Sequence, residues 1–443
     1  MAETEGRSVM RRIADGWVNV ISELGTDADK RTGFRFRRGR IDRTALSRRF
    51  VTDALTSRIA ELPAREMTRK WVRLDVSDDP DAISEMTQEW RRLGVRSKFQ
   101  EAITWSRLHG GAGIIMFARD DESDMSTPLN VDSLQEIESL KVVDGDDLKA
   151  WKYYQDPDDP EKFDTPELYT LNTVSRSSKV IHETRVLIFD GDPIPNRERR
   201  ERDGWGASAV ERSEQPLEDY LQGAHGIAHA LTDFAQAVLK IKGLANMLKH
   251  GEDVLVRKRI QMMDRLRSVM KLVPVDADLE DFSRVPTPMA GVPEALDRLA
   301  ELLSASTEIP IALLLGRSVG GLSDSDSAVI RGFYDSIASK QERLVVPQLT
   351  ELTHLLFIAS DGPTGGEEPD SWLIETVPLW QLDEKEEAEV RKLTAETDRS
   401  YLEDGVLHAD EVRTSRFGGE SYSVETVIDT SLDAALTAAD ADS

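Results

Sequence analysis

The chain contains several long stretches in which hydrophobic residues recur at helical spacing. Apolar positions three and four residues apart lie on one face of a helix, so each stretch predicts an amphipathic helix. Pro63 is expected to end the first of these helices, and Gly94 to interrupt the second. Pro347 should kink or interrupt the last one, because proline removes one backbone hydrogen bond. The predicted helices span residues 42–62, 83–108, 208–240, 293–308 and 325–358.

Short apolar runs separated by turn residues predict strands elsewhere in the chain. They occupy much of residues 140–195, and one more run, Ile114 to Phe117, follows the glycines of HGGAG. A dinucleotide-binding loop follows a strand and opens a helix, whereas these glycines follow a helical pattern and open a strand. The order of the elements therefore argues against a Rossmann site.

The remaining segments complete an α+β chain that is predominantly α-helical. Residues 196–208, which read NRERRERDGWGAS, predict a loop or linker. Residues 241–288 form a compact insert that combines strand-like runs with a basic helical segment. An acidic helix is predicted from Asp383 to about Leu402, and a C-terminus rich in Ala and Asp follows it.

Composition narrows the class of protein. With 443 residues the chain is long enough for two or three domains. A net charge of -26 argues against tight clamping of nucleic acid, which needs clustered Lys and Arg to neutralise phosphates. The absence of cysteine excludes disulfides, thiolate metal sites and cysteine nucleophiles. Since neither a long apolar run nor a signal-peptide segment is found, we expect a soluble, cytoplasmic chain.

Charge is distributed unevenly along the chain. Residues 1–70 carry 16 Lys and Arg against 10 Asp and Glu, with the excess in RTGFRFRRGRIDRTALSRR. Residues 361–443 carry 6 basic residues against 22 acidic ones. Such asymmetry suits an assembly whose parts face different partners, although a solvated or intersubunit ion-pairing surface explains the arginines equally well.

Residues 316–328 read GRSVGGLSDSDSA and raise the question of a phosphate-binding loop. A P-loop needs a lysine that reaches the outer phosphates, and this stretch has none. Asp324 and Asp326 would repel a nucleotide, whereas they suit a helix cap or first turn. The stretch therefore indicates a loop before a capped helix.

No motif predicts catalysis. His225 and His229 are four residues apart and would share a helix face, as zinc ligands do in H-E-x-x-H. Gly226 occupies the place of the catalytic glutamate, however, and no third ligand is evident nearby. We expect ordinary helical histidines, no metal, no cofactor and no enzymatic activity.

The order of the elements is more specific than any motif. A mixed N-terminal region leads to a long helix, a basic α/β insert, a short helix ending in TEIPIALLLG, a glycine-serine loop and a long proline-interrupted helix. Further matching segments are WSRLHGGAGIIMF, VLKIKGL and VPLWQLDEKEEAE, and residues 307–349 are the most specific part. In these features the chain resembles the portal proteins of tailed bacteriophages, over about residues 40–400.

The resemblance implies a portal fold with wing, stem, clip and a short crown-like C-terminal region. Because that last region is short, no extended crown or barrel is expected. The parts would be the wing (1–207), the first stem helix (208–240), the clip (241–288), the second stem helix (289–310), the tunnel loop (311–324), the long kinked wing helix (325–360) and the acidic crown-like region (361–443).

The resemblance also implies a structural role. Identical subunits, about twelve of them, would form a closed ring at one capsid vertex. Double-stranded DNA would pass through the ring with weak contacts during packaging and ejection. The other implied partners are the terminase large subunit, head-tail adaptor proteins, and the major capsid and scaffold proteins, with no membrane involved. The protein would reside in the virion, and in the host cytoplasm during assembly.

Two groups of residues take roles from the resemblance. Small and acidic residues of the tunnel loop would leave sliding DNA unheld, and its two glycines would let the loop change shape. The tunnel-loop residues are Arg317, Ser318, Gly320, Gly321, Ser323, Asp324, Ser325 and Asp326, of which the arginine would touch phosphate transiently or form a structural ion pair. The clip would meet partners through Arg257, Lys258, Arg259, Arg265 and Arg267, or these residues would form a solvated helix face.

Two other functions remain open at this point. One is a phosphate- or nucleotide-processing enzyme that uses the glycine-rich stretches GGAG or GRSVGG. The other is a different virion component, such as a head-morphogenesis or adaptor protein. The long helix, the insert, the short helix and the loop together favour the portal.

Overall fold

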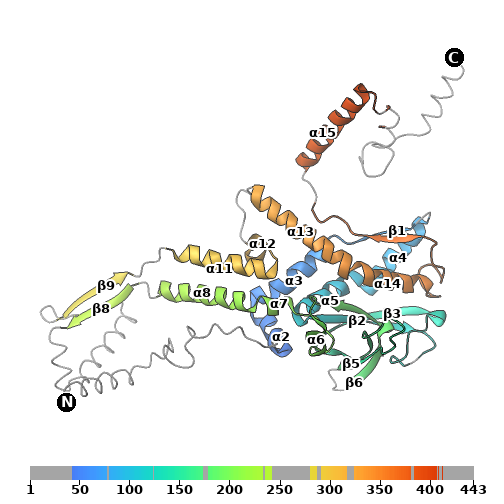
Figure 1. Ribbon diagram of the computed structural model, residues 1–443, viewed down its shortest axis with the longest axis horizontal. Helices are drawn as coiled ribbons and strands as arrows, with labels where there is room; N and C mark the ends of the chain where they lie inside the picture. Colours follow the sequence, from blue (N-terminus) through green and yellow to red (C-terminus); the bar gives the residue numbers. More distant parts are fainter. Residues whose placement is uncertain are drawn as a thin grey trace. The chain divides into compact units, whose positions relative to one another are not determined.

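The computed structural model describes residues 42–76, 79–122, 124–172, 178–232, 235–241, 280–286, 291–316, 324–380, 384–406, 408 and 412. The chain divides into two compact units, Met1–Val377 and Pro378–Ser443. All strands of the described residues lie in the first unit (Figure 1). The fold is α+β and predominantly helical, as the sequence predicted.

Four helices pack against one another at the start of the first unit: α2 (Arg43–Thr52), α3 (Ala54–Arg69), α4 (Pro80–Leu93) and α5 (Val95–His109). The Asp53 carboxylate caps α3 by accepting hydrogen bonds from the backbone N–H groups of Leu55 and Thr56. Gly94 has a left-handed φ of 64°, which ends α4 and begins α5. The predicted interruption at Gly94 is thereby confirmed.

Pro63 does not end the first predicted helix, and that prediction is wrong. Helix α3 continues through Pro63 to Arg69. A proline cannot donate a hydrogen bond to the carbonyl four residues earlier, which is that of Ile59. The guanidinium of Arg107 on α5 supplies the missing donors, with Nη2 3.0 Å and Nε 3.4 Å from that carbonyl oxygen. A contact from another helix therefore allows α3 to continue.

Two three-stranded antiparallel sheets follow, in the orders β3-β2-β7 and β4-β5-β6. They confirm the strands predicted within residues 140–195 and over Ile114 to Phe117. Two short 3-10 helices, η1 (Val131–Ser133) and η2 (Glu183–Arg185), lie between strands. The strands are β2 (Gly111–Arg119), β3 (Glu136–Asp144), β4 (Leu148–Tyr153), β5 (Pro166–Asn172), β6 (Ser178–His182) and β7 (Val186–Asp190).

Residues 196–208 were predicted to be a loop or linker; residues 201–207 do form turns and irregular chain, but the segment is packed, so the linker alternative is wrong. The segment contains the short helix α6 (Asn196–Arg200), and Trp205 is only 2% exposed. The indole Nε1 of Trp205 donates a hydrogen bond to the carbonyl of Leu148 at 2.7 Å. A Cβ at Gly111 would lie 2.0 Å from the indole, so only glycine leaves room for it there. The indole joins a core formed by both sheets, with Ile115, Leu148, Tyr169, Ile181 and Val186 among its members.

The next segment alternates helices with a strand pair. Its elements are α7 (Ala209–Arg212), α8 (Glu214–Thr232), β8 (Ala235–Ile241), β9 (Glu280–Pro286), α11 (Val292–Thr307) and α12 (Ile311–Leu315). The helix predicted over residues 208–240 therefore ends at Thr232. From Ala235 onward the chain pairs antiparallel with β9, and this long-range pairing prevails over the local helical pattern. The helix predicted over residues 293–308 is confirmed as α11, with Pro293 in its first turn.

The long C-terminal helical pattern is divided as expected. Helix α13 (Asp324–Leu344) and helix α14 (Val346–Ile358) meet at Val345, and Pro347 lies in the first turn of α14. Strand β10 (Trp372–Glu375) then pairs antiparallel with β1 (Arg73–Val76). Residues 361–377 consequently belong to the first unit, which corrects the predicted start of the acidic region at 361.

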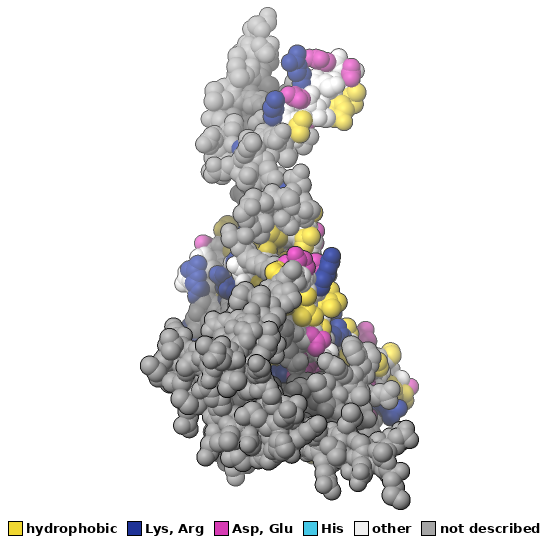
Figure 2. Space-filling model, turned by 90° about the vertical axis from the view of Figure 1, so that its left-hand side faces the viewer, with side chains coloured by type: hydrophobic (Ala, Val, Ile, Leu, Met, Phe, Trp, Pro, Cys, Tyr) yellow, Lys and Arg dark blue, Asp and Glu magenta, His cyan; other side chains and the backbone are white. Residues whose placement is uncertain are grey.

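The second unit contains the predicted acidic helix, α15 (Glu384–Glu403). No helix among the described residues has both the length and the apolar character to cross a membrane. Where Figure 2 shows described side chains, hydrophobic residues are interspersed with side chains of both charges. The part of that surface the structure describes thus carries no large patch of one sign.

Candidate functional site: the helix junction around residues 317–323

Helices α8 and α11 lie side by side and form the first part of the junction (Figure 1). Leu217, Ala300 and Leu303 are almost fully buried at the base of this pair. Farther along α8, a Cβ at Gly223 would lie 3.0 Å from Cδ1 of Leu299. A small residue therefore allows the two helices to approach closely at this point.

The turn after α11 is held by specific contacts. Glu308 has a left-handed φ of 58°, which reverses the chain direction after Thr307. The Ser304 hydroxyl donates a hydrogen bond to the carbonyl of Ile309 at 2.7 Å. Lys340 of α13 lies 2.8 Å from the Glu308 carboxylate. The hydrogen bond and the charge of Lys340 hold the pKa of Glu308 below its ordinary value. This contact links the end of α11 to α13.

Helix α12 is tied to α3 on the other side of the turn. The Arg58 guanidinium donates a hydrogen bond to the carbonyl of Leu313 at 2.8 Å, and Leu314 is 1% exposed. Gly316 ends the helix with a left-handed φ of 64°. Helix α13 is tied to α3 as well, because Gln341 donates to the carbonyl of Met67 at 2.6 Å. Helices α12 and α13, which precede and follow residues 317–323, therefore both contact α3, and α13 does so near its C-terminal end.

The Lys340–Glu308 pair predicts a pH-dependent contribution to stability. A depressed folded-state pKa stabilises the fold above the ordinary carboxyl pKa of 4.5 and loses its effect as the pH falls through the lowered value. The pair is partly exposed, so Glu308→Gln is expected to cost about 0.5 kcal/mol at neutral pH. The urea midpoints of the two proteins should converge between pH 5 and pH 3, that is, around and below about 4.5. In a Lys340→Met background the same substitution should have no pH-dependent effect; a difference that stays constant with pH would contradict the assignment.

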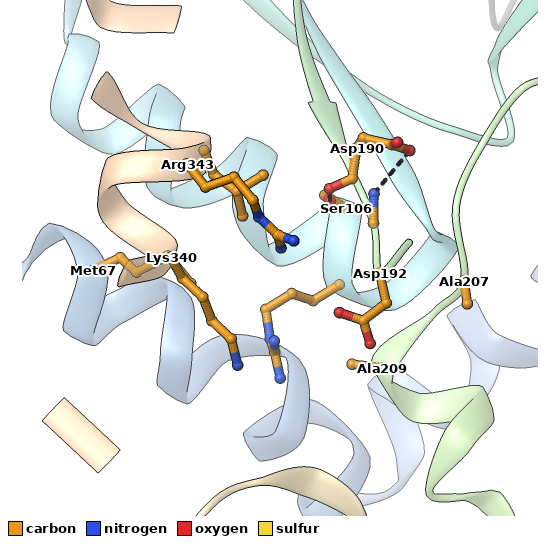
Figure 3. A pocket seen from close by; sticks show the side chains of 11 residues that line it. Met67, Ser106, Asp190, Asp192, Ala207, Ala209, Lys340 and Arg343 are labelled. Carbon is orange, nitrogen blue, oxygen red and sulfur yellow. Dashed lines mark hydrogen bonds between the residues drawn. The ribbon is translucent and has the colours of Figure 1, made fainter. Parts of the chain in front are cut away.

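A small cavity between α13, α5 and the end of β7 is the most charged site of the junction. Figure 3 shows Lys340 and Arg343 extending from α13 toward it, with Asp192 on the opposite side. Asp192 pairs with Arg212 at 3.2 Å, Asp190 pairs with Arg199, and Lys340 pairs with Glu308. Burial lowers the pKa of Arg107, which also lines the cavity, while Asp192 and Glu308 oppose that shift. Asp190, Asp192 and Lys340 thus form ion pairs within the protein, and the cavity, with a volume of about 20 Å³, has room for little more than a water molecule.

The residues predicted for the tunnel loop are only partly described. Arg317, Ser318, Gly320, Gly321 and Ser323 lie outside the described residues. Asp324, Ser325 and Asp326 are the first three residues of α13, which agrees with the predicted helix start near Ser325. The predicted boundaries 311–324 need correction, because residues 311–315 form α12. The apolar run IALLL forms a helix here because Leu314 is buried and Leu313 accepts the bond from Arg58.

The predicted clip residues Arg257, Lys258, Arg259, Arg265 and Arg267 lie outside the described residues. His225 lies exposed on α8. Within the described ranges, no group of three or more His, Cys, Asp or Glu side chains is arranged to hold a metal ion.

Sequence reasoning did not identify Arg58, Glu308 and Lys340 as the residues that anchor the junction. Each is an ordinary charged residue in a helical segment, and the partners of Arg58 and Lys340 lie 255 and 32 residues away. The segment STEIPIALLLG is the sequence signal that could have located this junction. A proline directly after Glu308 and Ile309 indicates a sharp change in the direction of the chain.

A family model described as phage portal protein matches residues 50–400, which include helices α8, α11, α12 and α13 of the junction and both three-stranded sheets. The chain belongs to the phage portal protein family. The resemblance noted from the order of the elements is thereby confirmed. The glycine-serine stretch and the helices on either side of it, α12 and α13, lie within the range matched by this portal family.

Relatives of this portal family chain are distant. A Sphingomonas paeninsulae protein named anti-CBASS protein Acb1 is 26% identical over 91% of this chain and 64% of its own length. An uncharacterized Haemophilus influenzae protein is 24% identical over 91% of this chain and 90% of its own length. The chain thus spans slightly less than two thirds of the first relative. Among solved structures, a chain in the neck of an empty gene transfer agent particle is 17% identical over 85% of this chain and 94% of its own, with a TM-score of 0.48.

Proposed function

We propose that the chain assembles into a closed ring at one capsid vertex and forms the channel through which a genome is packaged and ejected. Family membership over residues 50–400 is the observation that carries this proposal. The junction geometry supports it, because the helices on either side of residues 317–323, α12 and α13, both contact α3. A channel loop that contacts moving DNA needs a rigid support, because the force on the loop must not displace the rest of the subunit.

The elements take their portal roles with the boundaries that the structure defines. The wing comprises the α2 to β7 region with α13 and α14, and the stem comprises α8 and α11. The clip is the insert that begins with β8 and ends with β9. The tunnel loop is residues 317–323, and the crown-like region begins at residue 378. In this arrangement the clip contacts the terminase large subunit and then the head-tail adaptors, while capsid and scaffold proteins contact the wing.

The net charge of -26 supports a channel that lets DNA pass. Phosphates captured by clustered cations would become barriers to the next step of translocation, whereas acidic and small residues avoid such capture. Asp324 and Asp326, at the start of α13, stand next to the proposed loop. The ring itself catalyses no reaction in this proposal, and ATP hydrolysis belongs to the terminase. In this proposal the protein assembles in the host cytoplasm and then resides in the virion.

Native mass spectrometry with negative-stain imaging tests the ring. We expect closed particles of about twelve subunits with an axial opening, since heterologous contacts that close generate rings. A compact dimer that retains nucleotide through purification would contradict the portal and favour the phosphate-processing enzyme.

Shortening the loop tests the channel assignment. Deleting Ser318 to Gly321 is expected to leave ring assembly intact and to lower the amount of packaged DNA by about tenfold or more, because loops on a rigid base carry function while the base carries stability. The matched control replaces the same four residues with alanine and keeps the loop length. Packaged DNA is measured in purified particles by quantitative PCR. Rings that fail to form in the deletion variant would contradict the assignment of this loop to the channel.

A further inference from the structure

The outer edge of the β4-β5-β6 sheet carries an aromatic groove that the portal role does not use. Tyr153, Tyr154 and Phe163 line it together with Gln155, Asp164 and Arg200, and its volume is about 310 Å³. Phe163 is 50% exposed. Trp151 is 60% exposed on β4, where the register with β5 shifts between Ala150 and Lys152. A bulged edge strand with exposed aromatic side chains is a surface suited to a partner segment.

The rim of this groove is acidic. Asp156, Asp158, Asp159 and Glu161 are exposed, and no ion pair among the described residues includes them. The nearby cations are already engaged: Lys162 pairs with Glu183 at 3.0 Å, and Arg200 pairs with Asp164 at 2.9 Å. Lys162 also lies over the Tyr154 ring, with Nζ 5.1 Å from the centroid. The surface therefore offers uncompensated negative charge beside aromatic rings, which attract cations.

The described chain begins close to this groove. Arg43, at the start of α2, contacts Asp203 at 3.0 Å and the carbonyl of Arg202 at 3.1 Å. Asp203 accepts a hydrogen bond from the backbone of Ala150 on β4, at 3.2 Å through its carbonyl. A Cβ at the neighbouring Gly204 would lie 3.1 Å from the hydroxyl of Tyr153, which lines the groove. The first described residues, Asp42 and Arg43, thus lie near the groove.

We propose that residues 31–40 of the same chain dock in this aromatic groove. The segment reads RTGFRFRRGR and contains five arginines, two phenylalanines and no acidic residue. Its arginines complement the acidic rim, and its phenylalanines match the exposed rings in the groove. Ten residues of extended chain span roughly 33–36 Å, which is ample for a segment that ends two residues before Asp42. The docked segment covers the exposed aromatic side chains of the groove, a surface that otherwise invites association between copies.

Limited trypsin digestion of the full chain tests this docking, and mass spectrometry quantifies cleavage after Arg35, Arg37 and Arg38. Phe163→Ala and the double variant Asp158→Lys/Asp159→Lys should each raise the cleavage rate about fivefold or more, because cleavage follows the population of the undocked segment. The matched controls are Leu373→Ala, which is also an exposed apolar residue, and Glu85→Lys, an exposed charge reversal on α4. Equal cleavage rates in all five proteins would overturn the proposal.

Photocrosslinking identifies the occupant. With p-benzoylphenylalanine at position 36 of the full chain, we expect intramolecular crosslinks to residues 151–164. Crosslinks that join two chains at this surface would overturn docking within the chain and would assign the segment to a neighbouring copy. Protection from trypsin that requires added DNA would also overturn the proposal. Each of these readouts is independent of DNA packaging, so it can fail while the portal role holds.

Discussion

Replacing Asp120 with alanine is expected to destabilise the first unit by about 3–5 kcal/mol, because the change leaves a buried guanidinium without its counter-charge. The Asp120 and Arg185 side chains are 1% and 3% exposed, and their closest atoms are 2.6 Å apart. Arg185 also donates to the carbonyl of Thr127 at 3.0 Å, and Asp120 accepts from the backbone N–H of Asn130 at 3.1 Å. The pair therefore fastens the segment after β2 to the start of β7.

Urea unfolding followed by tryptophan fluorescence measures this cost. Arg185→Ala should be destabilising as well, and the double variant should cost less than the sum of the two single variants, since the second change removes the stranded partner. Glu167→Ala, which breaks the exposed pair with Lys152, is the matched control and should cost no more than about 1 kcal/mol. Additive effects of Asp120→Ala and Arg185→Ala would show that the two side chains do not act as a pair.

Replacing Trp205 with alanine is expected to cost about 3–5 kcal/mol, because a large buried side chain leaves a cavity that its surroundings fill only in part. The change also removes the donor to the Leu148 carbonyl, which lies in the same core. The Tyr169 ring, stacked on the indole with centroids 6.1 Å apart, would lose its neighbour. Because the Trp205 side chain packs with residues of both sheets, its removal should weaken the packing of the whole core that the sheets share.

The matched control for Trp205 is Trp151→Ala, the same substitution at a side chain that is 60% exposed. It should shift the urea midpoint very little, because few contacts are lost at an exposed position. Circular dichroism checks that both variants keep their secondary structure. Equal effects of the two substitutions would contradict the role of Trp205 as the buried link between the sheets.

Several elements could be predicted because their signals are local. The interruption at Gly94, the first-turn position of Pro293, the break near Pro347 and the acidic helix α15 all follow from glycine, proline and helical periodicity. The strand after Gly111 was equally visible as a short apolar run. In each case the residue that decides the structure lies within a few positions of the element it shapes.

The errors share a different cause. Pro63 was expected to end a helix, but Arg107 from α5 satisfies the carbonyl that proline leaves free. Residues 196–208 were expected to be a loop or linker, but Trp205 is buried in the core and donates a hydrogen bond to the Leu148 carbonyl. The helix expected to continue to residue 240 gives way to β8, whose partner begins at Glu280. In all three cases the local structure is determined by a contact with a residue far away in the sequence.

The sequence by itself determined the α+β class, most of the helices and strands, and the order of elements that marks the family. Helical and strand periodicity, glycine and proline are local properties, so they can be read without knowing what an element packs against. Only the tertiary structure determined which backbone carbonyls accept side-chain hydrogen bonds and which charged side chains form ion pairs. It anchored α12 through Arg58 and α11 through Lys340, and it placed the start of α2 beside an acidic aromatic groove. Such contacts depend on distances in space that no local pattern encodes.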